Sequence, residues 1–306
     1  MDASKLLARL HAGDARSIAR AISLVEEPGA AGAEILSGLD RERIAGALLI
    51  GMTGPPGAGK STLTGSLVRH LRRQGQRVGI VAVDPSSPVS GGAVLGDRIR
   101  MMDHALDREV VVRSMATRGR LGGLCAAAGA AARIMAASGC TTVLLETVGV
   151  GQSEMDIVRL ADLTVMVLAP GFGDEIQAMK AGILEVADLI VVNKADQPGS
   201  QKLVLDLGTV FSRAEDRDLR LLQTVASENQ GVAALLARIS EIAAQYRQDT
   251  TLDQKRARAF VLETLDWAQA LLRPKLATLA GAGVTSTDPR LAAEEIIAHL
   301  QQELRS

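Results

Sequence analysis

A glycine-rich segment at residues 54–62 has the residue types that hold nucleotide phosphates. It reads Gly-Pro-Pro-Gly-Ala-Gly-Lys-Ser-Thr. Glycines let the backbone turn its N–H groups towards phosphate oxygens, and a following helix adds the positive end of its dipole. Lys60 would neutralise charge on the β- and γ-phosphates, and Ser61 would offer a hydroxyl to Mg²⁺. The segment predicts a P-loop whose nucleotide-binding residues are Gly54, Gly57, Ala58, Gly59, Lys60, Ser61 and Thr62.

A second segment, residues 193–196, has the residue types that recognise guanine. The Asp196 carboxylate can accept hydrogen bonds from the ring N–H and from the 2-amino group of guanine, and adenine has no 2-amino group. Asn193 would tie this segment to the P-loop, and the stem of Lys194 would lie over the base. A backbone N–H after the next strand would meet the guanine carbonyl oxygen. The expected base-binding residues are Asn193, Lys194, Asp196 and one of Ala226 and Ser227. They predict that the protein binds GTP or GDP in preference to ATP.

Acidic residues that follow strands are the candidates for the metal site. Glu146 stands where P-loop proteins place an acidic Mg²⁺ ligand, and Gly149 stands where a glycine meets the γ-phosphate. Val150 follows Gly149, whereas Ras-like GTPases have at this point a glutamine that orients the attacking water. Intrinsic hydrolysis is therefore expected to be slow. The expected metal ligands are Ser61, Asp84, Asp97 and Glu146, although an aspartate after a strand is most often a turn or capping residue.

The composition argues against several classes of partner. The 306 residues carry 35 acidic and 34 basic side chains, so the net charge does not favour nucleic acid or an anionic membrane surface. No apolar run approaches the ~20 residues that cross a bilayer, and the first residues lack the pattern of a secretory signal. Cys125 and Cys140 are interpreted as reduced, buried small hydrophobes. We expect a cytoplasmic protein with no nucleic-acid or membrane partner.

Short apolar runs alternate with amphipathic segments through the middle of the chain. Most runs are continuously apolar, as parallel strands covered on both faces require. The pattern predicts an open, mostly parallel α/β sheet with helices on both faces, as in P-loop NTPases. We place an N-terminal helical extension at 1–45, the nucleotide domain at 46–248 and a C-terminal helical arm at 249–306. The expected strands are residues 47–52, 78–83, 110–113, 143–145, 163–168, 189–192 and 219–225.

The two flanking regions are expected to be helical. Residues 2–26 show two short helical patterns, residues 254–272 form one helix that should end before Pro274, and Asp288 should cap a last helix. The helix at 254–272 carries two apolar stripes. Either both stripes belong to one core, or one packs on the α/β domain and the other on a second protomer. The stripes are Val261, Leu265, Ala268 and Leu272, and Phe260, Thr264, Trp267 and Leu271.

Taken together, these motifs resemble the MeaB/ArgK/MMAA-type GTPases of the SIMIBI class, which are chaperones of adenosylcobalamin-dependent acyl-CoA mutases of the methylmalonyl-CoA mutase type. The resemblance is strong over about residues 40–250. It implies a homodimer held by C-terminal arms that binds GTP and Mg²⁺, gates adenosylcobalamin loading, and protects or reactivates the mutase. It rests on residues 54–62, 83–88, 91–92, 95–98, 118–119, 121–124, 146–154, 171–188 and 193–196.

The resemblance also implies roles for particular segments. Residues 146–154 would form one switch, and residues 171–187 an additional one that reports the nucleotide state to the mutase. Lys180 would reach towards the phosphates, and its alternative is a solvated helix residue. The acidic residues implied around Mg²⁺ and the attacking water are Asp84, Asp97 and Glu146, which makes the expected catalytic set Lys60, Asp84, Asp97, Glu146, Gly149 and Lys180.

Two other functions remain as alternatives. A nickel-delivery GTPase of the hydrogenase or urease maturation type would share the slow switch. Such proteins need clustered Cys and His ligands, whereas the four His and two Cys of this chain are scattered. A small-molecule kinase would consume GTP only in the presence of its acceptor, and the sequence shows no acceptor site.

Overall fold

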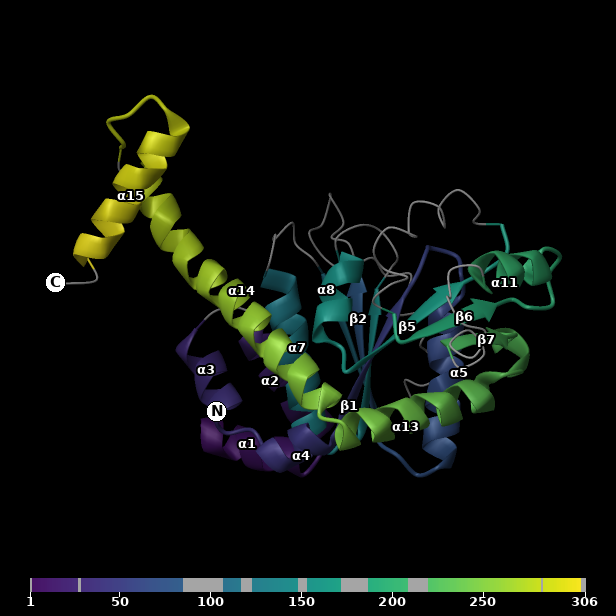
Figure 1. The fold of residues 1–306 in the computed structure, drawn as a ribbon. Helices are drawn as coiled ribbons and strands as arrows, with labels where there is room; N and C mark the ends of the chain where they lie inside the picture. The colour runs from purple at the N-terminus through teal and green to yellow at the C-terminus, as the bar shows by residue number, and fades with distance from the viewer. Residues whose placement is uncertain are drawn as a thin grey trace.

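A seven-stranded parallel sheet forms the centre of the molecule (Figure 1). The computed structural model describes residues 2–26, 29–84, 107–116, 123–147, 153–171, 187–208, 220–281 and 283–303. The strand order β3-β2-β4-β1-β5-β6-β7 places β1 in the middle, and every pairing is parallel. The predicted fold class is confirmed. The strands are β1 (Leu48–Thr53), β2 (Val78–Asp84), β3 (Val110–Ala116), β4 (Thr142–Thr147), β5 (Leu163–Leu168), β6 (Leu189–Asn193) and β7 (Leu221–Thr224).

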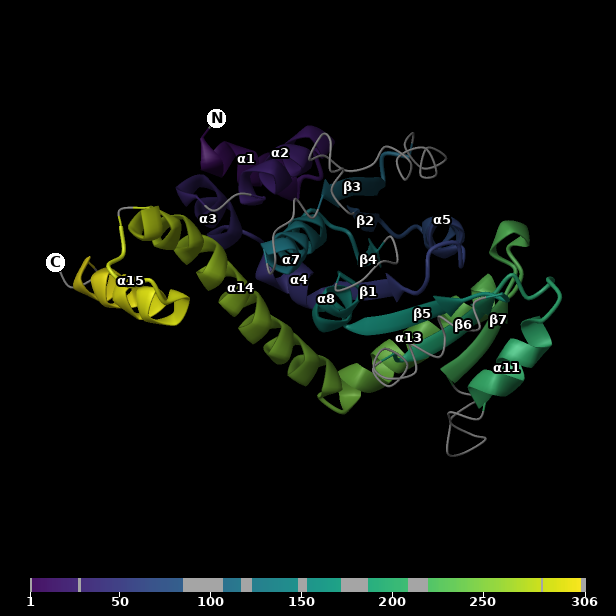
Figure 2. The ribbon, with the colours of Figure 1, turned by 90° about the horizontal axis from the view of Figure 1, so that it is seen from above.

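Helices cover both faces of the sheet, which explains why its strands are continuously apolar. Alternate residues of β4 enter different cores: Val143 and Leu145 face one, and Leu144 faces the other. The core on the Leu144 side contains α5 (Lys60–Arg73) and α13 (Val232–Gln248). The opposite core contains α7 (Gly123–Ala137) and α8 (Ser153–Leu160), together with the N-terminal helices. A third cluster joins β5 and β6 to α11 (Ser200–Gly208), and Figure 2 shows these layers from above.

Four N-terminal helices form a layer that packs on α7 through two of its members. They are α1 (Ala3–His11), α2 (Ala15–Val25), α3 (Ala30–Ser37) and α4 (Arg41–Gly46). In this layer, α2 and α4 pack on α7, and α1 and α3 pack on α2. The sequence predicted the first two. Asp14 caps α2, since its carboxylate accepts hydrogen bonds from the Ser17 N–H at 2.9 Å and the Ser17 hydroxyl at 2.6 Å. The two shorter helices, α3 and α4, were not predicted.

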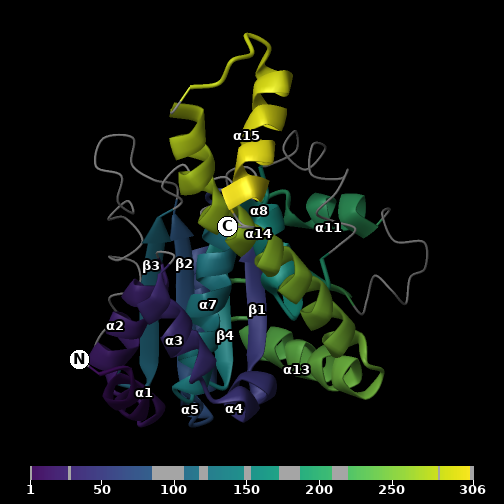
Figure 3. The ribbon, with the colours of Figure 1, turned by 90° about the vertical axis from the view of Figure 1, so that its left-hand side faces the viewer.

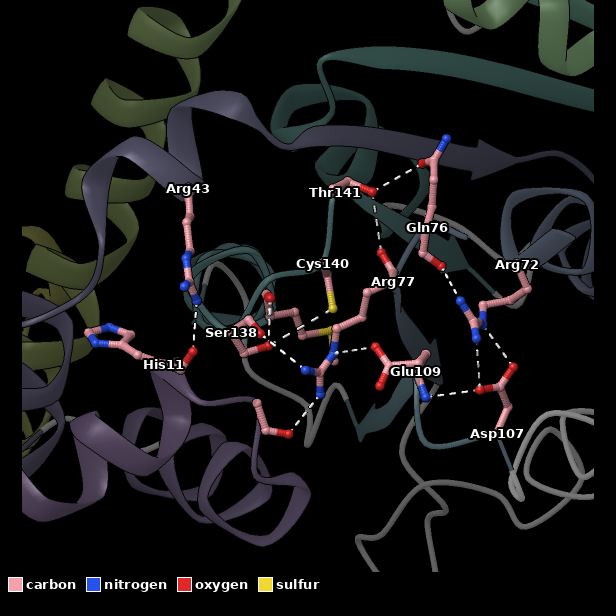
Figure 4. Close-up of polar contacts among 12 residues, drawn as sticks. His11, Arg43, Arg72, Gln76, Arg77, Asp107, Glu109, Ser138, Cys140 and Thr141 are labelled. Atoms are coloured by element: carbon pink, nitrogen blue, oxygen red, sulfur yellow. Dashed lines mark hydrogen bonds and ion pairs between the residues drawn. The ribbon is translucent and has the colours of Figure 1, made fainter. Parts of the chain in front are cut away.

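Two arginines hold this extension against the α/β domain (Figure 4). Arg77 donates to the carbonyl oxygens of Gly13 at 2.8 Å and Ser138 at 3.3 Å. Arg43 donates to the carbonyl oxygens of His11 at 2.8 Å and Ala137 at 3.1 Å. All four carbonyls lie at the C-terminal ends of α1 and α7, where helix carbonyls lack partners and the dipole is negative. Each guanidinium therefore stabilises two helix ends and joins them.

Cys140 lies in the same region and is 1% exposed. Burial raises the pKa of its thiol to about 11, so it packs as a neutral small hydrophobe, as the sequence predicted. The side chain of Cys125 lies outside the described residues.

The C-terminal arm consists of α14 (Thr251–Gly281) and α15 (Pro289–Glu303). The prediction that the first helix ends before Pro274 is wrong, because α14 continues through this proline. A proline removes one N–H from the helix, but strong helix formers on both sides, such as Leu272 and Lys275, sustain it. The predicted cap of α15 is present, because Asp288 accepts hydrogen bonds from the N–H groups of Arg290 and Leu291. Figures 1 and 3 show the arm extending beyond the α/β domain.

The face of α14 that packs on the domain matches neither predicted stripe as a whole, although Trp267 of the second stripe lies on it. Ala259 and Glu263 are buried on this face, and Trp267 is half-buried, one turn further along. Glu263 is tolerated there because Arg133 of α7 donates to both of its carboxylate oxygens, at 2.9 and 2.7 Å. Gly129 of α7 allows the close approach, since a Cβ there would lie 2.3 Å from a Glu263 oxygen. The interpretation that both stripes belong to one core is therefore wrong.

Partly buried ion pairs fix the start of α14 at the amino-terminal edge of the sheet. Arg256 donates two hydrogen bonds to Asp162, which precedes β5, at 2.8 and 2.7 Å. Its guanidinium also donates to the carbonyl oxygens of Ala45 and Ala47, just before β1. The neighbouring Lys255 binds both carboxylate oxygens of Asp188, which precedes β6, at 2.8 Å. Two consecutive residues of α14 thus bind groups that directly precede three strands, β1, β5 and β6.

No helix in the described part of the chain combines the length and apolarity needed to span a membrane.

The Arg256–Asp162 pair provides a test of how the arm is attached. Arg256→Ala should lower the free energy of unfolding by about 3 kcal/mol, because it leaves the 2%-exposed Asp162 carboxylate without its cation. Urea denaturation followed by circular dichroism would measure this. Arg290→Ala is the matched control, because its pair with Glu294 is exposed, and it should change stability by less than about 0.5 kcal/mol. Similar small effects for the two variants would contradict a structural role for the Arg256 pair.

Candidate nucleotide-binding site

The glycine-rich loop leaves the end of β1 and enters α5 at Lys60. Two of its glycines are required by close contacts. A Cβ on Gly54, whose φ is +133°, would lie 2.0 Å from the Val167 carbonyl oxygen. A Cβ on Gly59, whose φ is +93°, would lie 2.3 Å from the Asn193 side-chain nitrogen. The loop therefore lies against both β5 and Asn193 at the end of β6, and any side chain at these positions would force them apart.

Lys60 carries a positive charge into the interior of this loop. Its side chain is only 5% exposed, and its ammonium group donates to the carbonyl oxygens of Gly54 at 2.6 Å and Pro55 at 3.0 Å. These contacts hold the charge beside the backbone N–H groups at the start of α5. Thr62, two residues further along, is exposed on the first turn of the same helix.

Ser61 and Glu146 meet across the loop. Glu146 is the penultimate residue of β4, where it pairs with Met52 of β1, and it is 3% exposed. Ser61 donates a hydrogen bond from its hydroxyl to the Glu146 carboxylate, with 2.5 Å between the oxygens. Two of the four predicted metal ligands are therefore in direct contact at the carboxyl edge of the sheet.

Asn193 joins the P-loop to the segments expected to bind the base. It is 2% exposed at the end of β6, and its side-chain N–H donates to the carbonyl oxygen of Ala58 at 2.9 Å. Its side-chain oxygen accepts from the Thr224 hydroxyl at 3.0 Å and from the Ala226 N–H at 3.1 Å. The predicted tie to the P-loop is thus present. Thr224 is an additional member that the sequence prediction missed, although a β-branched hydroxyl at the end of a strand beside Asn193 was a usable signal.

Lys194 and Asp196 leave β6 in different directions. Lys194 has a φ of +56°, and its ammonium group donates to the Gly57 carbonyl oxygen at 2.8 Å, so its stem crosses from the base segment to the P-loop. The Ala195 N–H donates to the Thr224 carbonyl oxygen at 3.1 Å, which fixes the turn after Lys194. Asp196 is exposed beyond this turn, and no other described residue forms an ion pair or hydrogen bond with its carboxylate.

The short helix η2 (Ala226–Glu228) supplies the two predicted backbone amides. The Ala226 N–H already donates to Asn193, so a guanine carbonyl would have to share it. Ser227 is exposed at the next position, and within the described residues its N–H has no acceptor, as is usual in the first turn of a helix. The structure therefore favours Ser227 over Ala226 as the donor to a base.

Several predicted site residues cannot be placed. Asp97, Gly149 and Lys180 lie outside the described residues, as do residues 148–152 and 172–186 of the two expected switches. For Asp84 only the backbone is described, as the last residue of β2 beside Ala116. The roles of these residues remain predictions.

Comparisons with known proteins identify the family of the chain. The family described as methylmalonyl Co-A mutase-associated GTPase MeaB matches residues 18–280. A protein of Pyrococcus abyssi whose name describes a GTPase is 43% identical over 258 residues, which cover 82% of this chain and 79% of the relative. GTPase ArgK of Escherichia coli is 41% identical over 192 residues, which cover 61% of this chain and 58% of ArgK.

Two further similarities concern a mitochondrial protein and a solved structure. The mouse methylmalonic aciduria type A homolog is 44% identical over 147 residues, which cover 48% of this chain and 35% of the mouse protein. The crystal structure of an LAO/AO transport system kinase has a TM-score of 0.70 and 25% identity, and the match covers 98% of this chain and 97% of the kinase. From the family match over residues 18–280 and the 43% identity to the archaeal relative, the chain belongs to the MeaB family of methylmalonyl-CoA mutase-associated GTPases.

Proposed function

We propose that the protein is a slow GTPase whose nucleotide state controls an adenosylcobalamin-dependent acyl-CoA mutase. In this proposal it gates cofactor loading and protects or reactivates the mutase. The observation that carries the nucleotide part is the Asn193 side chain, which links the P-loop at Ala58 to the base-binding turn at Ala226. The mutase is proposed from the family description and from the similarity to the methylmalonic aciduria type A homolog.

The proposed phosphate site combines two kinds of charge compensation. Lys60 and the N–H groups at the start of α5 would face the β- and γ-phosphates. Ser61 and Glu146 fit Mg²⁺, because they bring a hydroxyl and a carboxylate oxygen together and Mg²⁺ prefers oxygen ligands. Mg²⁺, when bound, would neutralise charge on the phosphate oxygens. We propose that Asp84, Asp97, Gly149 and Lys180 complete the site.

Slow hydrolysis follows from the residues that are present. Val150 has no group that can orient water, so the isolated protein lacks a contribution that other GTPases have at this point. We propose that contact with the mutase arranges residues 146–154 and 171–187 and thereby accelerates hydrolysis. The rate of GTP hydrolysis would then indicate whether the complex with the mutase has formed.

The rate of GTP hydrolysis with and without a mutase tests this proposal. The isolated protein should hydrolyse GTP slowly, and purified methylmalonyl-CoA mutase should raise kcat at least about tenfold, equivalent to about 1.4 kcal/mol of transition-state stabilisation. Phosphate release would be followed at saturating GTP. Lys60→Ala should remove the activity in both conditions and so controls for contaminating GTPases. A rate unchanged by methylmalonyl-, isobutyryl- and hydroxyacyl-CoA mutases would rule out the chaperone role.

Two further measurements, of nickel binding and of phosphate transfer, separate the alternative functions. A nickel-delivery GTPase should bind nickel stoichiometrically, although no group of three or more His, Cys, Asp and Glu side chains is found among the described residues. A kinase, which is the activity in the name of the structurally similar LAO/AO transport system kinase, should transfer the γ-phosphate of labelled GTP to an acceptor. Release of labelled inorganic phosphate alone would support the GTPase.

Guanine selection depends on Asp196 in this proposal. Asp196→Asn should reduce the preference for GDP over ADP about 100-fold, because an amide cannot accept from both the ring N–H and the 2-amino group of guanine. Isothermal titration with both nucleotides would measure the ratio. Asp253→Asn, on the exposed first turn of α14, is the matched control. An unchanged ratio in Asp196→Asn would show that the base is recognised elsewhere.

We also propose that the arm forms a homodimer. The stripe containing Val261, Leu265 and Leu272 is exposed, with the first two at 56% and 55%. A groove of 630 Å³ beside it is lined by apolar residues that include Leu36, Phe260 and Trp267, together with charged residues such as Arg41 and Arg133. Contiguous apolar surface of this kind favours a protein partner, and a second copy would cover both protomers by symmetry.

Light scattering tests the dimer directly. The wild-type chain should have the mass of two protomers, and the double variant Val261→Glu/Leu265→Glu should have the mass of one, because two charges would have to be buried in the interface. Leu205→Glu is the control, since Leu205 is 67% exposed on α11, away from the arm. A double variant that still elutes as a dimer would place the interface elsewhere.

A further inference from the structure

Ser66 makes an unusual contact from the interior of α5. It is fully buried, and its hydroxyl donates to the Ala226 carbonyl oxygen at 2.8 Å, 160 residues further along the chain. A serine inside a helix more often bonds the carbonyl one turn earlier in the same helix. Ser66 is buried in α5 alongside Leu63 and Leu67.

Arg69 fixes the direction of this hydroxyl. Its guanidinium donates to the Ser66 oxygen at 2.7 Å. A serine hydroxyl has one hydrogen to donate and lone pairs to accept, so a donor on the oxygen leaves the O–H to point at Ala226. The contact is therefore a directed link from the helix that follows the P-loop to the helix η2.

The two peptide groups that flank Ala226 are both held by hydrogen bonds, and the second of them carries the Ser227 N–H. The Ala226 N–H donates to Asn193 at 3.1 Å, and the Ala226 carbonyl oxygen accepts from Ser66 at 2.8 Å and from the Asn229 N–H at 3.3 Å. With both groups fixed, the next N–H along the chain, that of Ser227, has a set direction. A donor that is already oriented binds its acceptor without a further loss of conformational freedom.

We propose that Ser66, oriented by Arg69, is a specificity-determining positioning residue, which holds η2 so that the Ser227 N–H donates to the 6-carbonyl oxygen of guanine. This inference rests on the base site proposed above, in which Asp196 recognises the opposite side of the ring. Ser66 itself does not touch the nucleotide. Its loss should therefore weaken recognition of one atom of the base, and leave the contacts of Asp196 and Lys60 in place.

The full-length protein and a pair of nucleotides that differ at one atom test the proposal. 6-Thio-GDP keeps the ring N–H and the 2-amino group of guanine but replaces the 6-oxygen with sulfur, which is a weaker acceptor. The wild-type protein should bind GDP about tenfold more tightly than 6-thio-GDP, the value of one well-formed hydrogen bond. Ser66→Ala should reduce this ratio to about twofold, mainly by weakening GDP, and Ser66→Thr, which keeps the hydroxyl, should restore it.

Thr64→Val is the matched control. Thr64 lies on the same helix and is 1% exposed, and among the described residues its hydroxyl has no hydrogen-bond partner. Removing that hydroxyl should leave the ratio unchanged. If Ser66→Ala does not fold, Arg69→Ala keeps the serine but removes the group that orients it, and should lower the same ratio.

Each outcome decides the proposal. A fall in the ratio for Ser66→Ala, or for Arg69→Ala in its place, with Thr64→Val unchanged, supports it. Equal weakening of GDP and 6-thio-GDP would show that Ser66 is only structural, and an unchanged ratio would show that it does not direct the amide. If Asp196→Asn also leaves the preference for GDP over ADP unchanged, then the base site itself is misplaced and both proposals fail. If Asp196→Asn does reduce the preference for GDP over ADP, but Ser66→Ala leaves the GDP/6-thio-GDP affinity ratio unchanged, only the proposal for Ser66 fails.

Discussion

The candidate site depends on the side-chain amide of Asn193. It is buried at the end of β6, where its N–H and oxygen bond three segments that are distant in sequence: the P-loop, the end of β7 and the start of η2. An amide in such a place must have its groups satisfied, or it costs free energy. In the proposed site, phosphate and base are recognised on different loops, and this one side chain sets the spacing between those loops.

At the opposite, amino-terminal edge of the sheet, basic side chains hold the helical extensions in place through ion pairs and hydrogen bonds. Arg256 and Lys255 at the start of α14 bind aspartates that precede β5 and β6, while Arg43 and Arg77 join the ends of α1 and α7. The nucleotide segments therefore lie at the carboxyl edge, and both helical extensions are anchored at the amino edge. Between the two edges, the strands β4, β5 and β6 are fully buried and close-packed.

Local patterns were sufficient to predict the sheet and the two motif loops. All seven strands were found, because continuous apolar runs such as β5 have no other stable environment. The buried face of α14 could not be predicted from apolarity, since it contains Glu263, which is tolerated only because Arg133 and Gly129 lie opposite. Ser66 was missed for the same reason: its partner is 160 residues away, and a single sequence records no such pairing.

Pro274 weakens one turn of the long helix α14. It lies inside α14 and contributes no amide hydrogen, so the turn before it is held by one hydrogen bond fewer than its neighbours. The first part of the helix is fastened to the body through Arg256 and Glu263. The part of α14 after Pro274 lies beyond these anchors and packs against α15. Bending of the arm relative to the body should therefore be easiest near residue 274, beyond the ion pairs at its base.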